Sequence, residues 1–183
     1  MPLIVTSPVA EKMYSLRTLT HSDVSQFREL RLAGLRESPA AFGQTAEEFE
    51  QMSEQELAAW IGPTQDKFIV GAFDELSKLV GIIGVNRQSR ERIRHKAVIW
   101  GVYVTPECRG QGISKSLLKR LIDDIGQIPG LQQLQLCVAT SQGAAESLYR
   151  STGFQEFGIE PRALRVDDRF VDELHMWMPL GAS

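Results

Sequence analysis

The spacing of apolar and polar residues predicts a helical N-terminal part followed by a part dominated by strands. Up to residue 60 the pattern favours one strand and two helices, over residues 14–20, 24–38 and 45–60. Ser22 or Asp23 is suited to cap the first helix, because short polar side chains accept hydrogen bonds from the first free amides. Thr45 and Glu48 have the spacing of a capping box at the start of the second.

From residue 67 onward the period becomes that of strands. Six strands are expected, over residues 67–73, 78–88, 96–104, 131–139, 154–160 and 170–180, with helices over 114–127 and 143–153. The segment 96–104 is almost wholly apolar, which is typical of a central strand covered on both faces. The element order is therefore β-α-α-β-β-β-α-β-α-β-β, which predicts an α/β fold (α+β, mixed sheet) with an antiparallel first half and later strand–helix–strand crossovers.

Length and composition agree with a single domain. The chain has 183 residues, of which 43% are hydrophobic and 23% charged, enough for one sizeable core. It contains no internal repeat, low-complexity segment or linker. We therefore expect residues 1–12 to form an N-terminal tail and residues 13–183 to form one domain.

Charge and composition exclude several classes of function. A net charge of −3 offers no general attraction for nucleic acid or anionic lipid, so neither is an expected partner. No apolar run approaches the roughly 20 residues that span a bilayer, and the start of the chain lacks the pattern of a signal peptide. Cys108 and Cys137 form no disulfide framework and no metal-ligand cluster, so a cytoplasmic protein without a metal is expected.

The stretch VTPECRGQGISKSLL, residues 104–118, joins an apolar strand to a helix and has the features of an anion site. Gly110 and Gly112 let a ligand approach the backbone closely. The first turn of the following helix offers unpaired amides and the positive end of the helix dipole, which together suit phosphate. The side chains that could add donors are those of Arg109, Ser114, Lys115 and Ser116.

Two common phosphate-binding motifs do not fit this loop. A Walker loop requires GxxxxGK[ST], but Arg109 stands at its first glycine and Ser114 at its second. A dinucleotide fingerprint requires GxGxxG, but Lys115 stands at its third glycine. Taken alone, the residues leave open whether the loop binds phosphate or is a glycine-rich turn between strand and helix.

Two stretches resemble the signatures of the GNAT superfamily, the acetyl-CoA-dependent N-acyltransferases. In YVTPECRGQGISKSLL, Arg109 and Gly112 match the acyl-CoA loop pattern [RQ]-x-x-G-x-[GA], and Ser114 replaces its last small residue. In LQLCVATSQGAAESLYRSTGF, the pattern N-x-x-A-x-x-L-Y-x-x-x-G-F is matched with Gln142 in place of asparagine. The matching residues there are Ala145, Leu148, Tyr149, Gly153 and Phe154. The resemblance extends from about Tyr14 to Leu180 and is strongest to one large bacterial branch.

The resemblance implies the GNAT acyl-CoA N-acyltransferase fold, with acetyl-CoA as co-substrate and no metal. In the family, the pyrophosphate of coenzyme A lies on loop amides, and the pantetheine arm follows the preceding strand, which splays from its successor. Tyr149 is implied as the general acid that protonates the departing thiolate. The implied cofactor-binding residues are Val102, Tyr103, Val104, Arg109, Gly110, Gln111, Gly112, Ile113, Ser114, Lys115, Gln142 and Tyr149.

The general base and the acceptor site stay open at this level. Many relatives have a glutamate early on the strand that here follows His95, so the usual base is absent and His95 itself is one candidate. Glu173 and His175 on the last strand are others, as is water relayed to a carboxylate. Substrate contacts are expected from the first two helices and the last hairpin, since these flank the thioester slot in relatives.

Other side chains near the expected site have two interpretations each. Trp100 shares a strand face with Val102 and could line the slot or pack in the core. Gln142 is expected to cap the following helix near the cofactor. Cys137 alternates within an apolar strand and is expected in the core, and Cys108 is not expected to act as a nucleophile.

The resemblance thus predicts an N-acetyltransferase that moves an acetyl group to a primary amine by direct attack in a ternary complex. One alternative is a non-catalytic acyl-CoA-binding or regulatory domain, which the substituted Ser114 and Gln142 keep open. The other is a transferase for a longer acyl group. The acceptor, a small molecule or peptide amine, is not identified, and Met176, Trp177 and Met178 could contribute to a homodimer.

Overall fold

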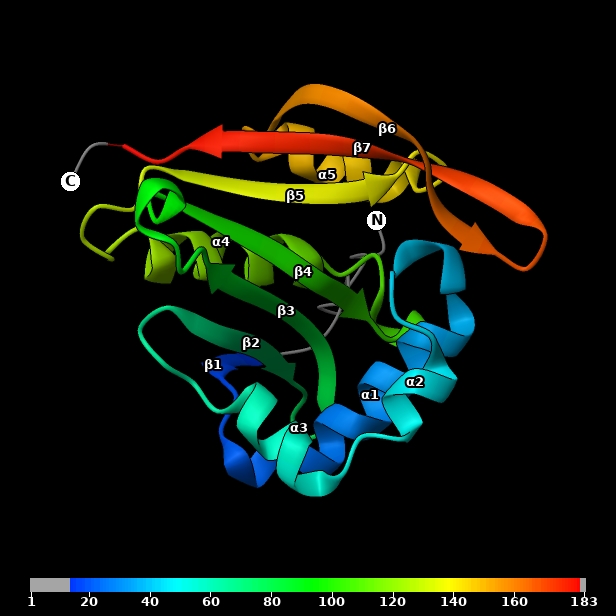
Figure 1. The fold of residues 1–183 in the computed structure, drawn as a ribbon. Helices are drawn as coiled ribbons and strands as arrows, with labels where there is room; N and C mark the ends of the chain where they lie inside the picture. The colour runs from blue at the N-terminus through cyan, green and yellow to red at the C-terminus, as the bar shows by residue number, and fades with distance from the viewer. Residues whose placement is uncertain (1–13, 182–183) are drawn as a thin grey trace, which may run out of the picture.

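The computed structural model describes residues 14–181, and these form one seven-stranded sheet with helices on both faces (Figure 1). The strands are β1 (Ser15–Thr18), β2 (Lys67–Phe73), β3 (Leu79–Arg87), β4 (Lys96–Val104), β5 (Gln133–Ala139), β6 (Gln155–Val166) and β7 (Arg169–Pro179). Their order is β1-β2-β3-β4-β5-β7-β6, and every adjacent pair is antiparallel except β4 and β5. The predicted α/β class with a mixed sheet is confirmed. The expected tail, residues 1–12, lies outside the described residues.

The helices follow the prediction with one exception. They are α1 (Val24–Glu37), α2 (Ala46–Glu50), α3 (Glu54–Ile61), α4 (Ile113–Ile125) and α5 (Gly143–Ser151). The single helix expected over residues 45–60 is wrong, because Ser53 and Glu56 form a second capping box in addition to that of Thr45 and Glu48. Each box satisfies the first free amides of its own helix, so the chain breaks between them. Within the described range, no helix is long and apolar enough to cross a membrane.

The start of α1 also differs from the expectation. Asp23 occupies the N-cap position, but its carboxylate makes no hydrogen bond to the helix. It accepts instead from both Nη atoms of Arg17, at 2.8 and 2.7 Å, and from the amide of Thr20 at 2.8 Å. The hydrogen bonds from Arg17 hold the pKa of Asp23 below its usual value. These contacts fasten β1 to the beginning of α1.

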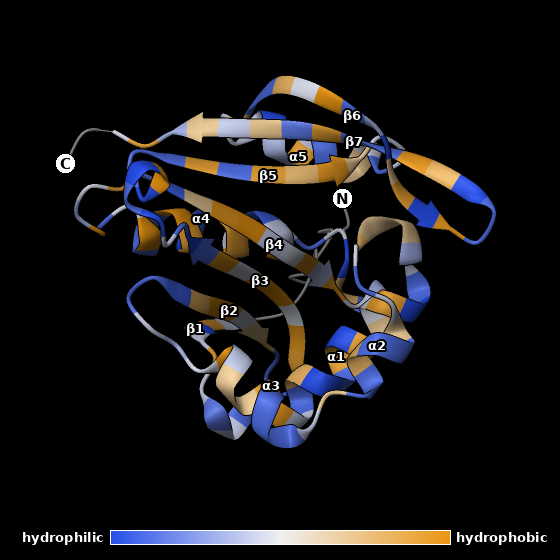
Figure 2. Cartoon of the chain, in the orientation of Figure 1, coloured by the Kyte–Doolittle hydropathy of each residue, from blue (hydrophilic) through white to orange (hydrophobic). Residues whose placement is uncertain are grey.

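Each face of the sheet carries its own apolar cluster. On β2, Val70 and Ala72 point into the cluster covered by α4 and α5, whereas Ile69 and Phe73 point into the cluster covered by α1–α3. This follows from the two-residue period of a strand. Figure 2 shows the hydrophobic colour concentrated on β2–β5 and the hydrophilic colour on the outer sides of the helices.

The strands β4 and β5 separate partway along their length. They pair only over Lys96–Val98 and Gln133–Gln135. Beyond this point β4 stays with β3 and β5 stays with β7, so the two strands diverge (Figure 1). The splay implied by the family resemblance is confirmed, and no strand of the described residues pairs with the outer half of β4 on that side.

A β-bulge in β4 decides which side chains face which cluster. Ile82 pairs with Tyr103 and Gly84 with Trp100, so β4 holds one residue more than β3 between these pairs. Gly101, within this segment, has a φ of +67°, which a side chain would adopt only at a cost of about 1–2 kcal/mol. The bulge reverses the alternation. Trp100 therefore packs against the α1–α3 cluster and Val102 against the other, and the expected shared face is wrong.

β7 lies between β5 and β6 and has no free edge. Met176 is fully buried in the core, while Trp177 and Met178 are partly buried. The expectation that Met176 contributes to a dimer contact is therefore wrong, because it already packs inside the protein.

Candidate functional site

The divergence of β4 and β5 forms a cleft of about 590 Å³. It is lined by the segment after α1, the outer half of β4, the glycine loop with the start of α4, the end of β5, and α5. Gln111, His95, Glu173 and His175 do not line it. The cleft brings together the other predicted residues, namely Trp100, Val102, Tyr103, Val104, Arg109, Gly110, Gly112, Ile113, Ser114, Lys115, Gln142 and Tyr149.

The glycine loop leaves its backbone amides free. Gly110 and Gly112 have φ values of +75° and +77°, and a Cβ at either position would have no protein atom within 4 Å. The amide of Ser116 donates to the Gly112 carbonyl and closes the first turn of α4. Within residues 14–181, the amides of residues 110–115 have no hydrogen-bond acceptor. Free amides at the start of a helix can bind an anion such as phosphate.

Arg109 fastens this loop to the end of α1. Its two Nη atoms donate to the carboxylate of Glu37, both at 2.8 Å, and its Nε donates to the Val104 carbonyl at 3.0 Å. The hydroxyl of Tyr103 donates to the same carboxylate at 2.6 Å. The hydrogen bonds from Arg109 hold the pKa of Glu37 below its usual value. The guanidinium therefore positions the loop and does not face the cleft as a free donor.

The remaining loop side chains divide between the cleft and its surroundings. Ser114 and Lys115 line the cleft. Gln111 donates to the Glu107 carbonyl at 3.3 Å and lines a second pocket, of about 280 Å³. Ser116 shares a hydrogen bond of 2.9 Å with the hydroxyl of Tyr14. Of these side chains, only those of Ser114 and Lys115 can meet a ligand in the cleft.

Tyr149 reaches the cleft from α5 with a buried ring and a free hydroxyl. The residue is 5% exposed, and its ring packs edge-to-face against Phe154 with the centroids 6.0 Å apart. Its hydroxyl has no hydrogen-bond partner among the described residues and is not one of the fully buried unpaired atoms, so it opens to the cleft. Burial raises the pKa of Tyr149 to about 12. The phenol is therefore protonated at neutral pH and can donate.

Gln142 lines the cleft beside α5. It stands at the N-cap of that helix, but its side chain makes no capping hydrogen bond. The expected N-cap position is confirmed, but the side-chain amide does not cap the helix and is available to a ligand.

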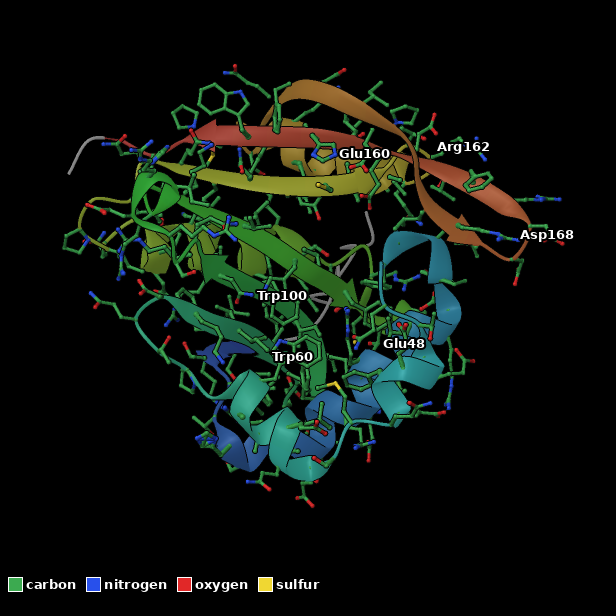
Figure 3. The ribbon with its side chains drawn as sticks, in the orientation of Figure 1. Glu48, Trp60, Trp100, Glu160, Arg162 and Asp168 are labelled. Carbon is green, nitrogen blue, oxygen red and sulfur yellow. The ribbon has the colours of Figure 1, made fainter. Side chains whose placement is uncertain are left out.

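Trp100 combines the two interpretations of its role. Its ring stacks on that of Trp60, with centroids 5.3 Å apart and an interplanar angle of 19° (Figure 3). Gly84 makes room for the indole, because a Cβ there would lie 2.4 Å from Trp100 Cε2. Trp100 also lines the cleft, so its ring packs on the core and forms part of the wall.

Cys137 is exposed and lines the cleft, so its expected place in the core is wrong. Its neighbours on β5 point into the α4–α5 cluster, and strand alternation turns Cys137 to the opposite face. Its Sγ lies 3.3 Å from His175 Nδ1, and His175 Nε2 lies 3.0 Å from Glu160 Oε2. Packing around the sulfur raises the pKa of the thiol to about 11. Cys137 is therefore not a thiolate at neutral pH.

The other candidates for the base differ in their distance from the cleft. Glu173 lies opposite Ala139, which lines the cleft, and burial raises the pKa of its carboxyl group. His95 precedes β4 at the paired end of β4 and β5, where its carbonyl accepts from the amides of Gln132 and Gln133. The structure therefore places Glu173 and His175 beside the part of β5 that lines the cleft, and it places His95 at the other end of β4.

Sequence reasoning missed several residues around the cleft. For Arg31 a signal existed, because helical spacing puts it on the same face of α1 as Phe27, Leu30 and Gly34, which are buried. The missed residues are Arg31, Glu37, Phe42 and Glu160.

Within residues 14–181, no group of three or more His, Cys, Asp or Glu side chains could hold a metal.

Comparison with known proteins identifies similar sequences. A profile of the Acetyltransferase (GNAT) family matches residues 29–154. The [ribosomal protein bS18]-alanine N-acetyltransferase of Escherichia coli K12 is 33% identical over 86 residues, which are 47% of this chain and 57% of that protein. The chain thus spans just over half the length of this relative. Spermidine N(1)-acetyltransferase of Vibrio cholerae is 25% identical over 138 residues, 75% of this chain and 76% of that protein.

The fold has similar solved structures. The crystal structure of a GNAT superfamily phosphinothricin acetyltransferase from Sinorhizobium meliloti, in complex with acetyl-CoA, has a TM-score of 0.78 and 24% sequence identity. The match covers 92% of this chain and 89% of that chain. At this level of identity the likeness is one of fold.

Proposed function

Because the chain belongs to the GNAT acetyltransferase family, we propose that it transfers the acetyl group of acetyl-CoA to a primary amine by direct attack in a ternary complex. The observation that carries this proposal is that free loop amides and a protonated, unpaired phenol meet in one cleft. The names of the two relatives give a ribosomal protein alanine and spermidine as their acceptors, and both are amines.

The residues of the cleft fit coenzyme A. Its diphosphate would lie on the amides of residues 110–115, where nothing fills the space over Gly110 and Gly112. Lys115 adds a positive charge beside these amides. The pantetheine arm would lie along β4 beyond Val98, where the strand has no partner on its β5 side.

Two groups of the chain would act on the thioester. When bound, acetyl-CoA supplies a carbonyl for attack and a thiolate as leaving group. The amide of Val102, beside the bulge, is our candidate for polarising that carbonyl. Tyr149 would donate its proton to the departing sulfur. Because a thiol has a pKa of about 8.5, well below that of this phenol, the sulfur can leave as a thiolate that Tyr149 stabilises by its hydrogen bond, and a proton that does pass to the sulfur is replaced on the phenol from solvent.

His175 is our candidate for the base that takes the proton of the amine. Its Nε2 lies 3.0 Å from the carboxylate of Glu160, which keeps the N–H on that nitrogen. Its Nδ1 then carries a lone pair and lies 3.3 Å from the sulfur of Cys137, which lines the cleft. Because Cys137 stands between the imidazole and the cleft, the amine's proton would pass to this sulfur while the thiol proton moves to Nδ1, or would travel through one water, and it would then leave to solvent.

The substituted signature positions do not favour the non-catalytic alternative. Ser114 and Gln142 both line the cleft without closing it. The free hydroxyl of Tyr149 favours catalysis as well, because a buried tyrosine with a structural role usually has a hydrogen-bond partner.

Thiol release from acetyl-CoA against a panel of amines tests the proposal. We expect release that depends on the amine, and a fall in kcat of about 100- to 10,000-fold in Tyr149→Phe, with unchanged affinity for CoA in calorimetry. Tyr14→Phe is the matched control, because it also removes a phenol hydroxyl but one outside the main cleft. If the protein bound CoA but released no thiol from acetyl-CoA or from longer thioesters, the result would support a non-catalytic acyl-CoA-binding domain instead. Full activity of Tyr149→Phe would remove Tyr149 from the mechanism.

A further inference from the structure

Three residues hold every buried side-chain nitrogen or oxygen that lacks a hydrogen-bond partner within residues 14–181. The atoms are Nε and Nη1 of Arg31, Oε1 of Gln44 and Nε1 of Trp100. Arg31 lies on α1, Gln44 lies two residues before α2, and Trp100 packs against the α1–α3 cluster, so all three belong to the same side of the sheet. Because buried polar groups are paired in nearly all native structures, these groups require a partner from outside the described residues, such as a ligand or water.

Arg31 is the strongest member of this group. It is only 6% exposed, and its Cζ lies 4.5 Å from the ring centroid of Phe42. Burial lowers its pKa to about 10, and no carboxylate contributes to that shift. The guanidinium is therefore charged at neutral pH and has no counter-ion among the described residues, which is unfavourable for an isolated buried charge. The fold keeps this arginine at a cost in stability.

The guanidinium lies directly behind the wall of the cleft. Phe42, over which it stacks, lines the cleft, and so does Gly101 of the bulge. A Cβ at Gly101 would stand 3.4 Å from Arg31 Nη1. The third nitrogen, Nη2, has no partner among the described residues but is not fully buried. Glycine at the bulge thus puts no side chain between this part of the cleft wall and the cation.

We infer that Arg31 binds a carboxylate of the acceptor, so that the acceptor is a free amino acid. This inference rests on the proposed acetyl transfer to an amine. A guanidinium presents its donors in a planar fork that matches the two oxygens of a carboxylate, and the unpaired indole Nε1 of Trp100 is a further donor on the same side of the sheet. The carboxylate of the acceptor would be the counter-ion that Arg31 lacks among the described residues.

The charge that an amino group requires lies behind the opposite wall, on residues that do not line the cleft themselves. Glu160, Glu173 and His175 lie on the β6–β7 hairpin, next to the part of β5 that lines the cleft. In Figure 3, Glu160 is on the hairpin side of β5 and Trp100 is on the β4 side. A zwitterion with its carboxylate toward Arg31 and its ammonium toward these carboxylates matches the charges that lie behind the two walls.

Other amines match less well. A polyamine has no anion and would add positive charge near an unpaired guanidinium. The amino-terminal residue of a peptide has its α-carboxyl group in an amide bond, so it lacks the carboxylate that the fork fits. These acceptors serve as the competing arms of the test.

The test compares each free L-amino acid with its amide and with spermidine, in the wild type, Arg31→Met and Arg31→Lys. We expect the wild type to prefer amino acids. Arg31→Met should raise KM for them about 10- to 100-fold and leave KM for the amides and Kd for CoA unchanged. Arg31→Met should also raise the melting temperature, because it removes an unpaired buried charge. Arg31→Lys keeps the charge without the fork and should recover only part of the affinity.

The outcomes separate this inference from the proposed function. Acetylation of amides or spermidine in preference to amino acids would overturn the carboxylate subsite and leave acetyl transfer intact. A lower melting temperature in Arg31→Met, with equal losses on acids and amides, would assign Arg31 a structural role. If no amine releases thiol, calorimetry of the amino acids on the CoA-bound wild type and Arg31→Met still decides, and equal or absent binding refutes the subsite.

Discussion

Replacing Gly112 by alanine separates the conformational role of this glycine from its role in binding. Its φ of +77° costs an L side chain about 1–2 kcal/mol, and no protein atom would contact the added methyl within 4 Å. The loss of unfolding free energy should therefore be about 1–2 kcal/mol, with no steric term. For a chain of this size it corresponds to a fall in melting temperature of about 2 to 8 °C.

The added methyl should weaken CoA binding by a separate mechanism. It would occupy the space over the free amides of residues 110–115 and hold a phosphate away from at least one of them. A hydrogen bond to a charged group contributes about 1.5–3 kcal/mol, so Kd for CoA should rise about 10- to 100-fold. Thermal unfolding and titration calorimetry with CoA measure the two effects on the same sample.

Gly130 provides a matched control for this experiment. Its φ of +75° is nearly the same, it lies outside the cleft, and a Cβ there would meet only Arg87 Nη2, at an ordinary 3.6 Å. Gly130→Ala should lose similar stability and keep the affinity of the wild type for CoA. An unchanged Kd in Gly112→Ala, or an equal rise in both variants, would refute the assignment of the diphosphate to this loop.

Two further predictions concern the walls of the cleft. Burial raises the pKa of Tyr149 to about 12 in the folded chain, against about 10 when unfolded. Its contribution to stability is complete below pH 10 and is lost as pH rises toward 12. Between pH 9 and 12, the free energy of unfolding measured in urea should therefore fall by about 2–3 kcal/mol less in Tyr149→Phe than in the wild type. Parallel curves of unfolding free energy against pH for the two proteins would contradict the burial of the phenol. Gly84→Ala would put a Cβ 2.4 Å from Trp100 Cε2, so the indole must leave its stack on Trp60. We expect a loss of about 1–3 kcal/mol in unfolding free energy and a higher KM for the acceptor at unchanged Kd for CoA. If Gly84→Ala had the same unfolding free energy in urea as the wild type, the stack of Trp100 on Trp60 would not contribute to stability.

The strands and most helices could be read from local pattern. The bounds of β2 and β4 are those predicted, because an apolar run between polar turns carries its own limits. Prediction failed where the period continued across a break. The pattern over 45–60 stays helical, and only the second capping box, at Ser53 and Glu56, divides it. That box was visible in the sequence, whereas the bulge at Gly101 depends on the pairing of β4 with β3.

The sequence by itself determined the chemistry that contiguous residues can make. The glycine loop and the start of α4 are neighbours in the chain, so their free amides follow from the order of residues. Tyr149 was found in the same way, as part of a motif on one short helix.

Only the tertiary structure decided which distant polar groups are paired and which are not. It pairs Arg109 with Glu37, brings His175 into contact with both Cys137 and Glu160, and gives Arg31 no counter-ion among residues 14–181. The physical reason is that a hydrogen bond or ion pair needs its two atoms within about 3 Å. For residues of different elements, this distance is set by the packing of helices on the sheet and by the register of the strands, not by spacing along the chain.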